Sequence, residues 1–67
     1  MGRKPIADII DVDEYDEATG DFCGCYMEVV DRHGNVLYTC DGDGEAQEWV
    51  EDNGYTFGRW KHEKRYC

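Results

Sequence analysis

The chain contains no serine, no long apolar run and almost no basic residue between positions 5 and 58. The absence of serine excludes a serine nucleophile. No stretch approaches the roughly 20 apolar residues that a membrane-spanning helix needs, so we expect no contact with a membrane. The apolar pair Ile6-Ala7 is interrupted at once by Asp8, a pattern that is not typical of a signal peptide. We therefore expect a cytoplasmic protein, and that compartment favours reduced cysteines.

Acidic residues dominate the composition and are unevenly distributed. Positions 5–58 hold fifteen of the sixteen acidic residues against one base, Arg32, which gives a net charge of −14, whereas positions 59–67 have a net charge of +3. An acidic surface disfavours nucleic acid and anionic membranes as partners and favours a basic protein surface. The alternative interpretation is that the carboxylates only keep a small protein in solution.

The length of 67 residues predicts a single domain over 1–67 with one small core. Alternating and β-branched patterns predict strands over 6–15, 22–31, 36–38 and 55–60. The spacing of Ala46, Trp49 and Val50 predicts one helix, which ends at Gly54. The predicted fold is therefore α+β, a small antiparallel sheet in the order β-β-β-α-β with one helix packed on one face. Residues 61–67 are expected to form a basic C-terminal tail.

Two finer expectations concern the ends of these elements. Acidic residues flank Val12, so we expect the second half of the first strand to be exposed or to lie at an edge of the sheet. Asp41 or Asp43 is expected to cap the first turn of the helix.

The turn between the second and third strands sets the register of that pair. Gly34 is expected at its left-handed position, with Asp31 paired to Asn35. Val30 then lies opposite Val36, and the next pairs are Glu28 with Tyr38 and Tyr26 with Cys40.

This register predicts two apolar faces, although the chain offers only one helix to cover them. Trp49 is expected to pack on Val30, Val36 and Tyr38. Met27, Val29 and Leu37 are expected on the uncovered face, beside Cys23 and Cys25. A monomer seldom exposes such a patch, so we expect a partner protein or a second copy of the chain to cover it.

The four cysteines and two histidines raise the question of a metal site. Cys23 and Cys25 form a C-x-C pair without the two-residue gap of zinc knuckles, and the predicted register places them on the face opposite Cys40. A cysteine-based zinc-binding interaction module remains an alternative to small buried hydrophobic residues, with Cys67 as a terminal thiol. The run from Asp41 to Glu45 lacks the glycine and glutamate of a calcium loop. We expect no metal and no other cofactor.

Residues 29–37 and 45–55 together resemble the hairpin-plus-helix unit of very short phage-encoded proteins. In size, acidity and lack of catalytic motifs, the chain is also similar to anti-CRISPR and other host-takeover proteins. The resemblance implies a non-enzymatic inhibitor that binds a host machine and blocks its nucleic-acid or partner site. It implies no particular binding residue.

The predicted function is therefore an acidic inhibitor that binds the basic, nucleic-acid-binding surface of a host protein. Successive carboxylates would stand in for phosphates, which lysine and arginine sites already bind. The residues predicted to bind the partner are the acids Asp11, Asp13, Glu14, Asp16, Glu17, Glu45, Glu48, Glu51 and Asp52 and the apolar residues Met27, Val29 and Leu37. The C-terminal run GRWKHEKRY alternates aromatic and basic residues, as some nucleic-acid-binding surfaces do. We expect no direct contact with nucleic acid, because this run can instead neutralise part of the acidic body of its own chain or of a second copy.

Overall fold

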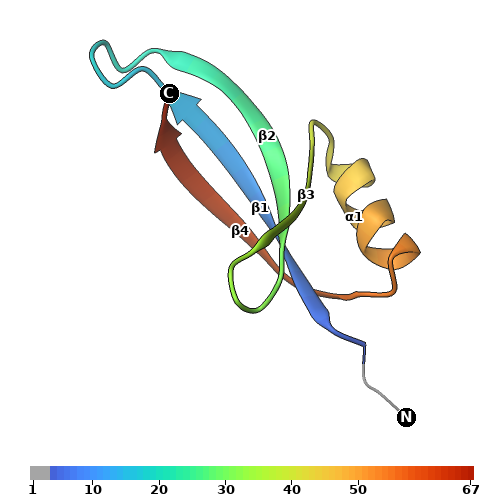
Figure 1. Cartoon of the computed structure of the whole chain (residues 1–67). Coiled ribbons are helices and arrows are strands. Elements are labelled where there is room, and N and C mark those ends of the chain that lie inside the picture. The colour runs from blue at the N-terminus through green and yellow to red at the C-terminus, as the bar shows by residue number, and fades with distance from the viewer. Residues whose placement is uncertain (1–3) are drawn as a thin grey trace.

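The computed structural model describes residues 4–67, apart from the side chain of Asp43. The elements are β1 (Ile6–Tyr15), β2 (Phe22–Val30), β3 (Val36–Cys40), α1 (Asp43–Asp52) and β4 (Thr56–Tyr66). The strands form one sheet in the order β3-β2-β1-β4, and α1 lies against one of its faces (Figure 1). The α+β class and the sequence of elements are thus confirmed. No helix among the described residues is both long and apolar enough to span a membrane.

β4 runs parallel to β1, so the sheet is mixed and the prediction of a purely antiparallel sheet is wrong. A helix between two strands returns the chain to its starting end, so β4 must run in the same direction as β3 and therefore as β1. β4 also takes in most of the predicted basic tail. β1 consequently lies inside the sheet and not at an edge. Its acidic second half is tolerated there because His62 and Lys64 of β4 pair opposite Asp11 and Asp13.

The pairing of β2 with β3 begins as predicted and then shifts by one residue. The backbone N–H of Asp31 donates to the carbonyl of Asn35 at 3.0 Å, and Val30 pairs with Val36. After the Val30–Val36 pair, a β-bulge leaves Leu37 without a partner on β2. Tyr38 therefore pairs with Val29, where the predicted partner was Glu28. A shift of one residue moves every following side chain to the other face of the sheet.

The bulge places Met27 and Val29 beneath α1, with 3% and 0% of their surface exposed. Met27 is also the residue that pairs with Cys40, where the predicted partner was Tyr26. Leu37 is half-buried and packs against the same core. The prediction that Met27, Val29 and Leu37 form an uncovered apolar face is therefore wrong. The core consists of Ala7, Ile9, Met27, Val29, Cys40, Ala46 and Val50.

The first turn of α1 also differs from the prediction. The residue that caps it is Gly42, which has no side chain to accept a hydrogen bond. The interior of the helix still forms where the apolar spacing predicted it, because Ala46 and Val50 are buried against the sheet.

The face of the sheet turned away from α1, here called the open face, is covered by its own long side chains. Arg65 reaches from β4 across β1 to β2, where its two Nη atoms donate to the carboxylate of Glu28 at 2.8 and 2.9 Å. It also donates to the hydroxyl of Tyr26 and to the carboxylate of Glu63. The hydrogen bonds with Glu28 raise the pKa of Arg65 above its ordinary value. Val12 of β1, on this face, is fully buried although no helix lies over it.

The end of the sheet farthest from α1 is closed by a disulfide bond between Cys23 of β2 and Cys67, which follows β4. β1 lies between these two strands and is joined to Cys67 by a hydrogen bond of 2.9 Å from the Cys67 N–H to the carbonyl of Tyr15. The expectation of reduced cysteines is wrong for this pair. Cys25 is exposed, and Cys40 is buried.

Candidate functional site

Three aromatic rings stack at the outer edge of the helix-covered core. The rings of Tyr38 on β3 and Trp49 on α1 have centroids 5.4 Å apart and an interplanar angle of 10°. The ring of Tyr55 also stacks on Trp49, with a centroid distance of 5.5 Å and an interplanar angle of 25°. All three side chains are half-buried, so parts of this stack remain accessible. Offset stacking at these distances is favourable for aromatic pairs.

The end of α1 explains how Tyr55 reaches Trp49. The N–H of Tyr55 donates to the carbonyl of Val50 at 2.9 Å, and the N–H of Gly54 donates to that of Glu51 at 3.2 Å. This pair of bonds is a Schellman motif, in which the residue after the helix adopts a positive φ. Gly54 has φ of +75°, which glycine adopts without steric cost. The motif turns the chain back on the helix and places Tyr55 against it.

A shallow pocket opens beside Tyr38 and Trp49, and its remaining lining residues are all acidic. They are Glu45, Glu48 and Asp52. Residues at positions i, i+3 and i+7 of a helix lie on one side of it, so the three carboxylates form a row along the two rings. Glu45, Glu48 and Asp52 are exposed, and none has an ion-pair partner among the residues that the structure describes. We call this site the acidic–aromatic pocket.

This row of carboxylates disfavours the isolated helix. Like charges at i,i+3 and i,i+4, such as Glu48 and Asp52, destabilise a helix by about 0.2–0.5 kcal/mol per pair. Asp52 also lies in the last turn, where the helix dipole is negative and no basic residue is present. A cation bound in the pocket would relieve both repulsions. Arginine fits best, because its planar guanidinium stacks on aromatic rings while it donates to carboxylates.

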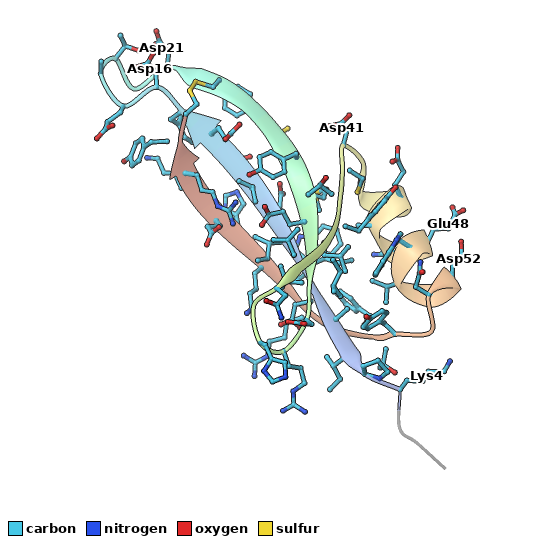
Figure 2. The ribbon with its side chains drawn as sticks, viewed as in Figure 1. Lys4, Asp16, Asp21, Asp41, Glu48 and Asp52 are labelled. Atoms are coloured by element: carbon cyan, nitrogen blue, oxygen red, sulfur yellow. A yellow bond between two sulfur atoms is a disulfide. The ribbon has the colours of Figure 1, made fainter. Side chains whose placement is uncertain are left out.

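The other predicted acids lie elsewhere and are partly engaged within the chain. Asp16 lies in the β1–β2 turn, where its Oδ1 accepts from the N–H groups of Ala18 and Thr19. Figure 2 shows Asp16 and Asp21 at that turn, far from Asp41, Glu48 and Asp52 around α1. Glu17 is exposed at the same turn. The structure therefore divides the predicted carboxylates among α1, the β1–β2 turn and β1 instead of forming one surface. Glu51 is exposed on α1 but does not line the acidic–aromatic pocket.

The acids of β1 are drawn toward the bases of β4. The Oδ2 of Asp13 lies 2.6 Å from the Nε2 of His62, and the Oδ2 of Asp8 lies 3.5 Å from the Nζ of Lys61. Asp11 and Glu14 are half-buried on opposite faces of the strand. Lys61 and Arg65 of the C-terminal run thus form ion pairs with acids of their own chain, Asp8 and Glu28.

No cluster of metal-ligating side chains among the described residues includes a cysteine. Within residues 4–67, the only three side chains close enough together to hold a metal ion are Asp11, Asp13 and His62, and this group contains no cysteine. Two of the four cysteines are joined in the disulfide, and Cys40 is buried beside the carbonyl of Gly42. The alternative of a cysteine-based zinc module is therefore not supported by the fold.

Comparison with known proteins adds no relative to this description. No family model matches the chain, no curated protein matches it, and no solved structure matches it.

The aromatic half of the acidic–aromatic pocket is not evident from the sequence pattern. The apolar spacing predicts Trp49 as a core residue and Tyr55 as part of the next strand. Of the predicted contacts of Trp49, the one with Tyr38 is confirmed, whereas Val36 is 52% exposed. The signal that could have revealed the stack is Gly54, because a glycine directly after a helix predicts a Schellman motif, and the residue that follows it folds back on the last turn.

Proposed function

We propose that this protein is a small non-enzymatic inhibitor that binds the basic, nucleic-acid-binding surface of a host protein through the acidic–aromatic pocket. The observation that supports the proposal is the row of Glu45, Glu48 and Asp52 along the rings of Tyr38 and Trp49. An arginine side chain of the partner enters this pocket and can no longer bind a phosphate. The resemblance to phage-encoded antagonists supports the same kind of role.

Charge density decides between a local contact and mimicry of a whole duplex. The molecule measures 52 × 22 × 15 Å. Duplex DNA carries one charge per about 1.7 Å of its axis, so a duplex of that length has about 30 charges. This chain has a net charge of −9 and neutralises several acids internally. The proposed inhibitor therefore competes for a few basic side chains rather than for a long groove.

The apolar patch that suggested a homodimer is buried beneath α1. We therefore propose a partner of different sequence and no dimer. The pocket is shallow and its three carboxylates are exposed, so the proposed role is binding and not catalysis.

The proposal is tested by measuring the affinity for an arginine-rich peptide by calorimetry at 50 and 300 mM NaCl. The variant E48Q/D52N removes two charges from the pocket and should weaken binding about tenfold, because a charge-assisted hydrogen bond contributes about 1.5–3 kcal/mol. Binding should also weaken as salt rises, because screening becomes stronger.

The matched control is E17Q/D21N, which removes the same charge from the exposed β1–β2 turn. It should change the affinity less than twofold. Equal losses in the two variants would show that the peptide responds to net charge and not to the pocket. Affinity capture from host lysate with wild type and E48Q/D52N then identifies the partner, and addition of its nucleic acid should release it.

A further inference from the structure

Three of the chain's seven bases line one pocket on the open face of the sheet. Arg32 comes from the β2–β3 turn, and Arg59 and Lys61 come from β4. Ile6, Asp8 and Gly58 complete the lining. Arg32 is the only base between positions 5 and 58, yet the fold brings it beside two of the C-terminal bases. Three bases that repel one another are thus held together in a chain whose sixteen acids could pair with them, and this clustering needs a physical reason.

A second β-bulge directs Arg59 to this face. Ala7 pairs with Phe57 and Ile9 pairs with Trp60, so Gly58 and Arg59 both lie opposite Asp8. The Oδ1 of Asp8 accepts the backbone N–H of Arg59 at 2.9 Å. A Cβ atom at Gly58 would lie 2.6 Å from Cγ2 of Ile6 and would overlap the carboxylate of Asp8, so a larger residue there would displace these side chains. Bulges of this kind commonly aim a side chain at a functional site.

The pocket has a local excess of positive charge. Its lining holds three cationic side chains and one carboxylate, a net charge of +2. Asp8 partly compensates Lys61, whose Nζ lies 3.5 Å from Oδ2. Among the residues that the structure describes, neither guanidinium, that of Arg32 nor that of Arg59, has an ion-pair partner. Like charges held around one pocket repel each other, and a bound anion removes that repulsion.

We propose that this pocket binds the phosphate monoester group of a small ligand. A phosphate monoester carries about −1.5 to −2 charges near neutral pH, which matches the local excess. Two guanidinium groups can each donate two hydrogen bonds to its oxygens, and Lys61 supplies a third cationic donor. The acidic body weakens long-range attraction of an anion, but at 0.15 M salt charges more than about 8 Å away are largely screened. The inference does not depend on the acidic–aromatic pocket, which is formed on the other side of the sheet.

The test is a titration of the full ¹⁵N-labelled chain with inorganic phosphate in 50 mM NaCl, followed by amide chemical shifts. Saturable shifts are expected at Gly58 and Arg59. The variants R32Q and R59Q should each weaken binding about tenfold, because each removes charge-assisted hydrogen bonds. Their amide spectra away from the pocket report whether the fold is intact.

The matched control is K64Q, which removes one charge from the opposite face, where Lys64 lies over the ring of Tyr15. It should weaken binding less than twofold. Equal losses in K64Q and R59Q, or shifts that do not saturate, would overturn the proposal. Parallel titrations with O-phosphoserine and adenosine 5′-monophosphate distinguish the source of the phosphate group. The compound that binds more tightly than inorganic phosphate identifies the kind of ligand that carries the phosphate group. The same compound should bind R59Q no more tightly than inorganic phosphate does if it occupies this pocket.

Discussion

The two faces of the sheet are protected from water by different means. On one face, α1 covers Ile9, Met27 and Val29 with apolar side chains. On the open face no helix is present, yet Val12 is as fully buried as Ile9. There the long side chain of Arg65 crosses β1 and is held by its hydrogen bonds to Glu28.

The comparison shows how a chain with one short helix can complete a two-faced sheet. A long charged side chain covers apolar surface with its methylene groups, provided that its charged end finds a partner. Glu28 is that partner, and it is 6% exposed. The helix face therefore depends on apolar packing, whereas the open face depends on an ion pair and on the position of β4.

The largest effect is expected on the helix face, from I9A. Removing the buried side chain of Ile9 leaves a cavity and should lower the free energy of unfolding by about 2–5 kcal/mol. That loss is enough to unfold much of a domain of this size. Ile10 is half-buried on the open face and provides the control I10A, in which the free energy of unfolding should fall by less than in I9A. Urea denaturation checks both, and an equal loss would show that the helix face is no better packed than the other.

The disulfide holds β4, which supplies the cover of the open face. Cys23 and Cys67 are 44 residues apart, and closing a loop of that length is worth about 2–4 kcal/mol in typical proteins. C23S, or reduction of the wild type, should lower the melting temperature accordingly. The exposed Cys25 provides the matched control C25S. A melting temperature that does not respond to reductant in the wild type would contradict this role.

E28Q tests the ion pair directly. A neutral glutamine at this position cannot compensate the charge of Arg65. Because the Arg65 side chain is 36% exposed and also contacts Glu63, the free energy of unfolding should fall by only about 1–2 kcal/mol. E63Q is the control, because Glu63 is more exposed and its contribution should be below about 1 kcal/mol. Urea denaturation of both variants ranks the two carboxylates. If E63Q loses more than E28Q, the buried pair is not what secures the open face.

The smallest effect is expected at the β2–β3 turn and depends on pH. The side-chain amide of Asn35 and the N–H groups of Asn35 and His33 hold the pKa of Asp31 below its ordinary value of 3.8. A lowered pKa in the folded state stabilises the protein above pH 3.8, and this stabilisation is lost as the pH falls through the folded pKa.

D31N should therefore flatten the decrease of stability below about pH 4 while changing both faces of the sheet little. Thermal unfolding between pH 2 and 5 measures this slope. D41N, at an exposed aspartate outside the turn, should retain the wild-type slope. A slope that is unchanged in D31N would show that Asp31 does not titrate with folding.

The strands, the helix and their order were predictable because they depend on local patterns. β-branched residues, the turn at Gly34 and the spacing of Ala46 and Val50 act over a few residues. The acids of the candidate pocket were predictable for the same reason, since Glu45, Glu48 and Asp52 lie on one helix. The register beyond Val30 was not predictable, because the bulge at Leu37 shifts the pairing of β2 and β3 by one residue.

The sequence by itself thus determined the elements and the excess of acidic charge. Only the tertiary structure decided which charges are paired, because ion pairs join residues distant in the chain. Arg65 finds Glu28 and Lys61 finds Asp8 only after β4 has paired in parallel with β1. The same pairing places Arg59 beside Arg32, while the acids of α1 lie beyond the reach of these bases. Coulombic interactions depend on distance in space, and the distance along the chain does not predict it.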